Sequence, residues 1–298
     1  MLILYYHNVV NTPLDEFDRK LSRIYVDEFA EQMRQVAAHY RPVSLEAMFE
    51  MLQKGEVDPK AVVITFDDGY AGVITYALPI LKQLSIPATI FVVMNHVGDA
   101  ELLHFDELEI AFRLTSIETL DVSFAGERAF RLASAHAKVD MMKRLKKLMK
   151  SMPNAERLSA QDELLEKLAV DRSERLAYRN SHEKFWTASW EDLRRAQQDG
   201  LAVGSHTCSH PVLSRLARNE LEHEIRDAYA RLREEISGDF LPFAYPYGTA
   251  ASIDGDAPAL VKEAGYTCAL TTLPGKNQSE TDPFLLHRVE FESLMWPF

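Results

Sequence analysis

Two short runs of branched apolar residues, 61–66 and 88–93, constrain the fold of this chain more than any other feature. Runs of this length and composition are typical of strands that are buried on both faces. A helical stretch through Leu84 separates them, and strands that alternate with helices pair in parallel. Further runs that continue the pattern lie at 2–6, 201–205, 241–245, 267–271 and 285–289. We therefore expect an α/β fold around a parallel sheet.

Apolar residues at spacings of three and four, together with capping residues, place helices between these strands. Ser44 is a candidate cap for one helix, and Ser189 with Asp192 forms the S-x-x-D pattern of a capping box. Gly265 follows the last helix, where glycine commonly ends helices. The pattern predicts helices at 26–40, 44–55, 189–200, 219–236 and 257–264.

Between about residues 101 and 181 the strand signals fade and two helical patterns appear. We interpret residues 1–298 as one domain that this helical insertion interrupts, and we expect the insertion to shape substrate specificity or an oligomer contact. The first pattern carries Met142, Leu145 and Met149 on one face, so its basic residues are expected on the solvated face, without a function. These basic residues are Lys138, Lys143, Arg144, Lys146, Lys147 and Lys150.

The charge balance excludes several classes of partner. The chain has 33 Lys and Arg against 45 Asp and Glu, a net charge of −12, which disfavours nucleic acid, anionic membranes and strongly anionic polymers. Two cysteines cannot form a disulfide framework, and a reducing compartment fits best. The first residues lack the basic flank of a secretory signal, and no run of 18 apolar residues suggests membrane insertion. We expect a cytoplasmic protein.

Polar clusters follow three of the expected strands, at the end where α/β barrels carry their active sites. Asp67 and Asp68 follow the run 61–66, His206 and His210 follow 201–205, and residues 245–248 read Tyr-Pro-Tyr-Gly. Taken alone, Asp-Asp-Gly is usually a turn, and two histidines four residues apart are common. Together, Asp68, His206 and His210 suit a three-ligand site with positions left open, the arrangement of a catalytic metal.

Thr65–Tyr70 and His206–Pro211 resemble the first two motifs of the polysaccharide deacetylases, carbohydrate esterase family four, which includes chitooligosaccharide deacetylases. Tyr5–His7 and Phe243–Gly248 extend the resemblance, which covers both flanks of the insertion but not the insertion itself. The resemblance implies a distorted (β/α) barrel and metal-dependent removal of an N-acetyl group from an amino sugar. The substrate would be an oligo- or polysaccharide or a glycan precursor.

The resemblance also assigns roles to single residues. Asp67 matches the general base, and the backbone N–H of Tyr247 matches the oxyanion donor. Thr207 matches a residue that steadies the second histidine through a hydrogen bond. The matched ligands of the divalent metal, usually Zn²⁺ and in some cases Ni²⁺, Co²⁺ or Fe²⁺, are Asp68, His206 and His210.

Two positions depart from the family pattern. Many members carry an arginine that pairs with the base carboxylate where this chain has Ala244, which leaves the partner of Asp67 open. The general acid is also open. His287 lies in a Leu-Leu-His sequence similar to the last family motif, whereas His7 belongs to the opening Tyr-His element. We favour His7 slightly.

The remaining polar and aromatic residues carry weaker expectations. Tyr70 and Tyr247 are candidates to stack on a sugar ring. Cys208 is interpreted as a loop residue that makes the site sensitive to oxidants. Four further histidines are expected at the surface: His104, His136, His182 and His223.

Two other function classes compete with the deacetylase. Two histidines and one carboxylate are also the ligands of non-haem iron oxygenases, although the second carboxylate beside the ligand argues against that class. A carbohydrate-binding protein that kept the fold without activity is the other alternative. The sequence leaves the glycan and the oligomeric state undetermined.

Overall fold

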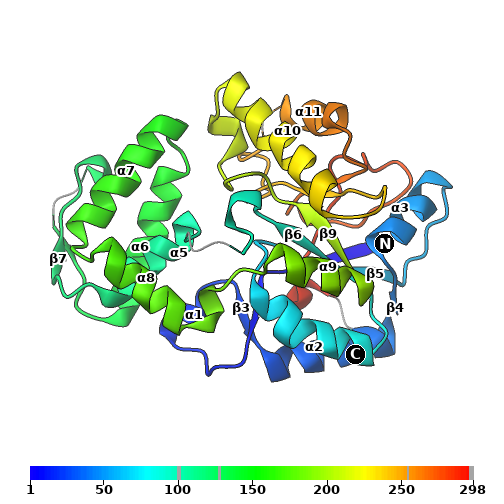
Figure 1. Ribbon diagram of the computed structural model, residues 1–298, viewed down its shortest axis with the longest axis horizontal. Helices are drawn as coiled ribbons and strands as arrows, with labels where there is room; N and C mark the ends of the chain where they lie inside the picture. Colours follow the sequence, from blue (N-terminus) through cyan, green and yellow to red (C-terminus); the bar gives the residue numbers. More distant parts are fainter. Residues whose placement is uncertain (99–101, 127–128, 254, 295–298) are drawn as a thin grey trace.

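A curled parallel sheet forms the centre of the computed structural model, which describes residues 1–98, 102–126, 129–253 and 255–294 (Figure 1). Six strands follow the order β1-β5-β6-β9-β10-β11, and β4 pairs with β5 as a seventh. Their bounds are β1 (Leu2–Tyr6), β4 (Arg41–Pro42), β5 (Ala61–Phe66), β6 (Ala88–Val92), β9 (Leu201–Ser205), β10 (Phe243–Ala244) and β11 (Ala269–Leu270).

The two edges of this sheet approach each other through the segment 286–289. Leu286 forms a parallel bridge with Leu270 of β11, and Val289 forms one with Leu4 of β1. The strand expected at 285–289 is therefore reduced to two isolated bridges, and the sheet becomes a distorted barrel. β10 is also shorter than the expected 241–245, because Pro242 and Pro246 have no N–H to donate to a ladder.

Helices cover the outside of the barrel, with α10 and α11 on one side and α2 and α9 on another (Figure 1). Ser44 and Ser189 each accept a hydrogen bond from the first turn of the helix they cap, as expected. Gly265 ends α11 with a φ of 107°. The bounds are α1 (Glu16–Arg19), α2 (Val26–His39), α3 (Leu45–Gln53), α4 (Leu78–Gln83), α9 (Trp190–Gln198), α10 (Arg218–Glu235) and α11 (Ala257–Ala264).

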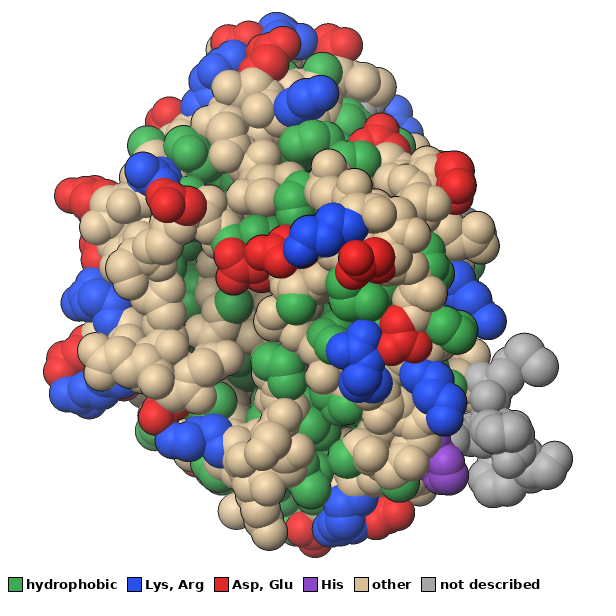
Figure 2. Space-filling model, turned by 90° about the vertical axis from the view of Figure 1, so that its right-hand side faces the viewer, with side chains coloured by type: hydrophobic (Ala, Val, Ile, Leu, Met, Phe, Trp, Pro, Cys, Tyr) green, Lys and Arg blue, Asp and Glu red, His purple; other side chains and the backbone are tan. Residues whose placement is uncertain are grey.

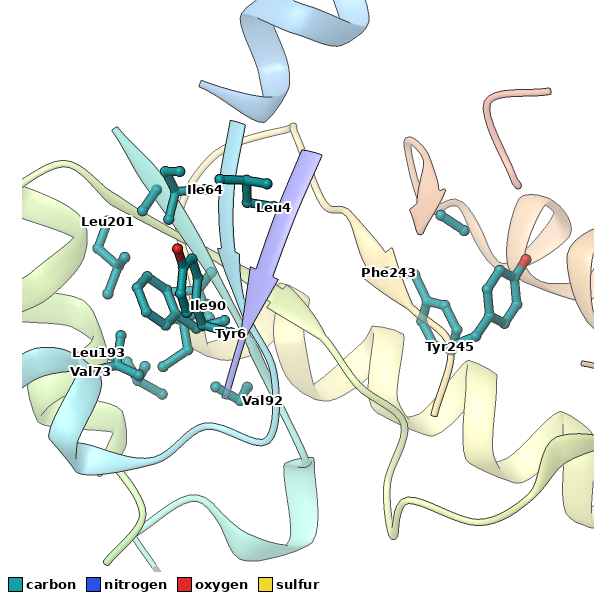
Figure 3. Close-up of a cluster of buried hydrophobic side chains, with 14 of the residues drawn as sticks. Leu4, Tyr6, Ile64, Val73, Ile90, Val92, Leu193, Leu201, Phe243 and Tyr245 are labelled. Atoms are coloured by element: carbon teal, nitrogen blue, oxygen red, sulfur yellow. The ribbon is translucent and has the colours of Figure 1, made fainter. Parts of the chain in front are cut away.

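The main core lies between the sheet and these helices. Every residue of β5 and β6 is buried, as expected for strands covered on both faces. Figure 3 shows part of this cluster, in which Leu4, Ile64 and Ile90 from neighbouring strands share one core with Val73 and Leu193. The sequence pattern thus correctly predicts the buried strands whose carboxyl ends carry the polar clusters.

The region expected as an insertion forms a separate group of helices beside the barrel (Figure 1). It contains α5 (His104–Leu114), α6 (Ala135–Met149), α7 (Asn154–Lys167) and α8 (Arg172–Ser181), with a hairpin of β7 (Thr119–Leu120) and β8 (Phe130–Arg131). The sequence patterns predict only α6 and α7. Residue 101, the expected start, lies outside the described residues, and the division into one domain and an insertion stays a prediction.

A second hydrophobic core lies in the insertion, where Phe112, Leu145 and Leu164 are fully or almost fully buried, and Phe17 of α1 belongs to it as well. A short parallel pair, β2 (Asn8–Val10) and β3 (Arg23–Tyr25), lies outside the main sheet. No helix in the described part of the chain combines the length and the apolar character that a membrane crossing requires.

Candidate metal centre

Three expected metal ligands meet at the carboxyl ends of β5 and β9. Asp68 follows β5 directly, and His206 and His210 lie in the loop after β9. The Oδ1 atom of Asp68 lies 3.6 Å from Nε2 of His206 and 3.5 Å from Nε2 of His210. Two ligand atoms of a tetrahedral zinc, each about 2.0–2.2 Å from the ion, stand about 3.4 Å apart. The three side chains are therefore already spaced for one ion.

The hydrogen bonds of these side chains leave their ligand atoms free. Nδ1 of His206 donates to the carbonyl oxygen of Ala244 at 2.7 Å, so Nε2 carries the lone pair. Among the described residues, the buried Oδ1 of Asp68 has no hydrogen-bond partner, and neither has Nδ1 of His210, the ring nitrogen that faces away from Asp68. Burial raises the pKa of Asp68 well above its usual value, and neighbouring Asp67 and Asp106 raise it further. A divalent cation would relieve this cost, so the residues fit a metal.

The loops that hold the ligands adopt a conformation that ordinary residues avoid. Asp68, Thr207, His210 and Tyr247 have φ values between 60° and 71°, and they are four of the seven described non-glycine residues with positive φ. Such left-handed positions cost free energy and cluster at functional sites. Gly248 also has a φ of 60°, and a Cβ there would lie 2.4 Å from the backbone nitrogen of Thr272.

Two side chains hold the histidine loop in place. Oγ1 of Thr207 accepts a hydrogen bond from the backbone N–H of His210 at 2.9 Å. Glu224 of α10 accepts bonds from the backbone N–H groups of Cys208 and Ser209, each at 2.9 Å. The bond of Thr207 thus goes to the backbone of the second histidine and not to its ring, and sequence reasoning missed Glu224 altogether.

The partner of Asp67 is Arg288, which sequence reasoning did not identify. The Arg288 side chain is fully buried, and its Nη1 and Nη2 each donate to one carboxylate oxygen of Asp67 at 2.8 Å. Burial alone would raise the pKa of Asp67, but the charge and hydrogen bonds of Arg288, with His206 and His7, hold it at about 2. Arg288 therefore occupies the role left open by Ala244. A basic residue within the apolar run 285–289 was the available signal.

The two candidate acids lie in different places. His7 lines the pocket that contains Asp67 and the ligands, whereas His287 does not. Neighbouring residues of an extended segment point to opposite sides, so the inward direction of Arg288 turns His287 away. Nδ1 of His287 lies 3.3 Å from the carbonyl oxygen of Leu273. Burial lowers the pKa of His7 to about 4, against the opposing charge of Asp67.

The two tyrosines singled out by sequence both line this pocket. The backbone N–H of Tyr247 donates no hydrogen bond to any described residue, so it is free for a ligand. The hydroxyl of Tyr70 donates to Asp106, with both carboxylate oxygens at 2.9 Å, and the side chain is only 4% exposed. Stacking of either ring on a sugar stays a prediction, and Tyr70 has little open face for it.

Several residues expected at the surface belong to the site instead. His104 begins α5, and its Nε2 lies 3.2 Å from the hydroxyl of Tyr247. Lys146 and Lys150 line the same pocket, whose volume is about 340 Å³. The helix period correctly predicts the apolar residues of α6, but Lys146 and Lys150 lie on or beside that apolar face and point to the pocket, and not to solvent as expected. His136 and His223 do lie at the surface, where they contact acidic side chains.

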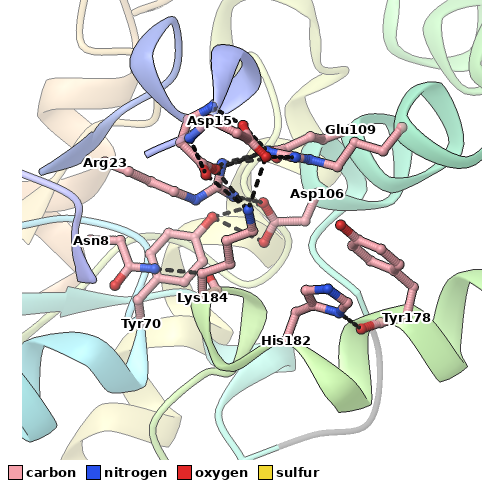
Figure 4. Close-up of polar contacts among 11 residues, drawn as sticks. Asn8, Asp15, Arg23, Tyr70, Asp106, Glu109, Tyr178, His182 and Lys184 are labelled. Atoms are coloured by element: carbon pink, nitrogen blue, oxygen red, sulfur yellow. Dashed lines mark hydrogen bonds and ion pairs between the residues drawn. The ribbon is translucent and has the colours of Figure 1, made fainter. Parts of the chain in front are cut away.

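A buried ion network connects the pocket to the insertion (Figure 4). Nη1 of Arg23 lies 2.9 Å from both carboxylate oxygens of Glu109, and Nη2 lies 3.5 Å from Asp106. Nζ of Lys184 contacts both oxygens of Asp18, at 3.0 and 2.9 Å. Burial raises the pKa of Asp106 to about 7, although Arg23 opposes this. The network joins the neighbouring elements α1 and β3 to α5 and to Lys184, which lie far from them in the sequence.

The thiol of Cys208 is poorly placed for the oxidant sensitivity expected of it. The side chain is buried, and its Sγ lies 3.7 Å from the carbonyl oxygen of His223. Burial, with the charge of Glu224, raises the thiol pKa to about 12. Because the thiolate is the species that reacts with oxidants, this geometry argues against that expectation.

Comparisons with known proteins agree with the fold. The *Streptococcus pyogenes* deacetylase PplD in complex with acetate has a TM-score of 0.61 at 17% identity, covering 97% of this chain and 91% of that one. IcaB from *Ammonifex degensii* has a TM-score of 0.60 at 20% identity, covering 97% and 90%. At this identity the likeness concerns the fold, a (β/α) barrel of the deacetylase type.

Curated sequences match over a shorter stretch. A poly-beta-1,6-N-acetyl-D-glucosamine N-deacetylase of *Staphylococcus epidermidis* is 33% identical over 107 residues, covering 33% of this chain and 37% of that protein. The protein of the same name in *Staphylococcus aureus* is 31% identical over 80 residues, covering 26% and 28%. The match thus spans about a third of the length of these curated relatives.

The polysaccharide deacetylase family model matches residues 54–151 and 162–269. This match includes both ligand loops and continues to residue 151, so the resemblance extends into the insertion, contrary to the expectation that it covers only the flanks. With more than half of its length matched, the chain belongs to the polysaccharide deacetylase family.

Proposed function

We propose that this protein is a metal-dependent hydrolase that removes the N-acetyl group from an amino sugar of an oligo- or polysaccharide or a glycan precursor. The observation that carries the proposal is the carboxylate of Asp67, which Arg288 holds ionised beside three side chains that fit one metal. The family, and curated relatives named for the deacetylation of poly-N-acetylglucosamine, support the same reaction class.

We also propose Zn²⁺ as the resident ion. Two imidazole nitrogens and one carboxylate oxygen are ligands that zinc accepts, and three protein ligands leave a position open for chemistry. When bound, the ion would lower the pKa of water and polarise the acetyl carbonyl. Imidazole and carboxylate ligands also suit Fe²⁺, Co²⁺ and Ni²⁺, so the metal must be measured.

Three groups of this chain carry out the remaining steps, which are proton removal, stabilisation of the oxyanion and protonation of the leaving group. Asp67 accepts the proton of the attacking water, because its pairing with Arg288 keeps it anionic and fixed in direction. The free backbone N–H of Tyr247 donates to the oxygen of the tetrahedral intermediate. His7 lines the same pocket, and in its protonated form, which the charge of Asp67 favours against burial, it protonates the leaving nitrogen.

The test is metal content by mass spectrometry together with acetate release from an N-acetylglucosamine oligomer. We expect one equivalent of metal, acetate release that a chelator abolishes, and recovery when zinc is added back. Bound metal without acetate release from any N-acetyl sugar would contradict the hydrolase. Activity that returns only with iron and consumes oxygen would assign the site to the oxygenases instead.

A further inference from the structure

Three cationic side chains of the insertion converge beside the metal site. Nζ of Lys150, directly after α6, lies 3.8 Å from the centre of the Tyr247 ring. Nζ of Lys146, one helical turn earlier, lies 5.4 Å from the centre of the Phe105 ring. Arg157 of α7 is only 9% exposed, and its positive charge acts on His104 together with those of the two lysines.

None of these three cations has a carboxylate partner within 4 Å among the described residues. The guanidinium of Arg157 donates to the neutral Oδ1 of Asn154, at 3.1 and 3.3 Å. Lys146 is attracted by Glu109 and Asp106, but Arg23 already contacts both carboxylates. The charge of Asp68 raises the pKa of Lys150, and a bound metal would neutralise that charge. Glu224 acts on Arg157 from a distance as well, so the three cations are attracted by carboxylates but are in direct contact with none among the described residues.

This arrangement differs from that of other buried cations among the described residues. The side chains of Arg23, Arg113 and Lys184 all contact carboxylates. On the face shown in Figure 2, positive and negative side chains are interspersed. Burial and the neighbouring Lys146 lower the pKa of Lys150 to about 8. Acidic residues also line the pocket, but none of them forms an ion pair with Lys146 or Lys150: Asp67, Asp68, Asp106, Glu109 and Glu290.

We propose that Lys150, with Lys146 and Arg157, forms a subsite for an acidic substituent of the substrate. This inference rests on the proposed function and narrows its substrate to an N-acetylated sugar that carries a carboxylate or a phosphate close to the acetamido group. An ammonium over a ring face keeps its charge available to such a group, and an acidic ligand would supply the direct contact with an anion that these cations lack. The pocket as a whole is lined by more acidic than basic residues, so the expected preference is for a single acidic group beside Lys150 and not for a strongly anionic polymer.

The kinetic test compares three substrates on the zinc-loaded protein. They are a neutral N-acetylglucosamine oligomer, an oligomer in which N-acetylglucosamine alternates with glucuronate, and N-acetylglucosamine linked to a phosphate. We expect kcat/KM to be about tenfold or more higher for one of the acidic substrates, and the preference to shrink as salt rises. The better of the two distinguishes a carboxylate from a phosphate. Equal kcat/KM for neutral and acidic substrates would overturn the proposal.

Substitutions in one helical stretch separate this role from a structural one. Lys150→Gln should lower the ratio of acidic to neutral kcat/KM about tenfold, mainly through KM, and Lys150→Arg should restore most of it. Lys147→Gln is the matched control, because Lys147 is an exposed lysine of α6 that does not line the pocket. An equal loss on neutral and acidic substrates in Lys150→Gln would contradict the subsite.

A binding measurement keeps the subsite testable if no substrate releases acetate. Calorimetry on the zinc-loaded Asp67→Asn protein would compare the same three ligands, and unfolding temperatures would confirm that each variant is folded. We expect about tenfold tighter binding of an acidic ligand, lost when Lys150→Gln is added. Tighter acidic binding without acetate release would retain the subsite and reject the hydrolase. Equal binding of neutral and acidic ligands would reject the subsite.

Discussion

Arg288 and Asp67 form a buried ion pair, and removing either side chain leaves the other as a buried unpaired charge. Breaking a buried ion pair on one side usually costs about 3–5 kcal/mol. We therefore expect Arg288→Met to lower the free energy of unfolding by roughly this amount, and to lower activity as well because Asp67 loses its orientation. Chemical denaturation and acetate release measure the two effects.

Two companion variants identify the cause. Arg288→Lys keeps a charge but loses the two parallel hydrogen bonds, so its loss of stability should be intermediate. In the double variant Arg288→Met with Asp67→Asn no carboxylate remains unpaired, and most of the stability should return. If the double variant is as unstable as Arg288→Met alone, packing of the arginine, and not the ion pair, accounts for the loss.

Substitutions of Asp67 and of His206 should separate the loss of catalysis from the loss of metal binding. Asp67→Asn should reduce activity by about 10²–10⁴-fold, the usual contribution of a general base, while the metal stays bound. His206→Ala removes a ligand and should abolish both. Metal analysis of dialysed protein alongside acetate release provides the check, and equal metal loss in both variants would contradict this division of roles.

The choice of general acid follows from the direction of two histidine side chains. His7 lines the pocket and His287 does not, so His7→Ala should lower kcat strongly while His287→Ala changes it little. His287→Ala is a suitable comparison because it also removes a partly buried ring. A large loss of kcat only in His287→Ala would reverse the assignment.

At the level of helices and strands, the network between β3 and α5 makes stability depend on pH. Burial raises the pKa of Asp106 to about 7, so the folded chain keeps a proton that the unfolded chain releases near pH 4. Wild-type stability should therefore fall between about pH 4 and pH 7 relative to Asp106→Asn, which has no proton to lose. From pH 5 to pH 8 the difference in unfolding free energy should change by about 2–3 kcal/mol.

Tyr70→Phe provides the matched comparison for this prediction. The tyrosine hydroxyl donates to the Asp106 carboxylate and so favours its ionised form. Its removal should move the pH-dependent window upward. A constant difference between wild type and Asp106→Asn across pH 5–8, measured by urea unfolding, would show that Asp106 is ionised in the folded chain.

The sequence predicts well those strands and helix caps whose pattern lies within a few neighbouring residues. The strands 2–6 and 61–66 and the caps Ser44 and Ser189 depend on neighbours within a few positions, and the structure confirms them. The grouping of Asp68, His206 and His210 could also be predicted, because the carboxyl ends of neighbouring parallel strands meet at one edge of the sheet. These signals define the barrel and the position of the site.

Features that depend on a distant partner could not be predicted in this way. Arg288 meets Asp67 across 221 positions of sequence, and no local pattern records that pairing. The period of α6 shows which residues are apolar, but not that Lys150 directly after it meets Tyr247. The short hairpin of β7 and β8 has only two residues in each strand, too few to give a pattern.

In the whole molecule, a bound metal would act as a cross-link. Asp68 follows β5 and the two histidines follow β9, and β6 lies between these strands. An ion that binds only the folded chain stabilises it by about 2.7 kcal/mol at a free concentration 100 times its Kd. We therefore expect zinc to raise the unfolding temperature of chelator-treated protein by roughly 5 °C under such conditions, whereas His206→Ala should show no rise.

Scanning calorimetry of the chelator-treated protein, with and without added zinc, also tests whether the insertion unfolds together with the barrel. The hydrophobic core of the insertion includes Phe17 of α1, and Arg23, Lys150 and Asp106 join the insertion to the site through charges and ring contacts. If these contacts couple the two parts, one transition should be seen, and zinc should move all of it. Two transitions, of which zinc moves only one, would show that the insertion unfolds independently, and the barrel alone would then carry the metal centre.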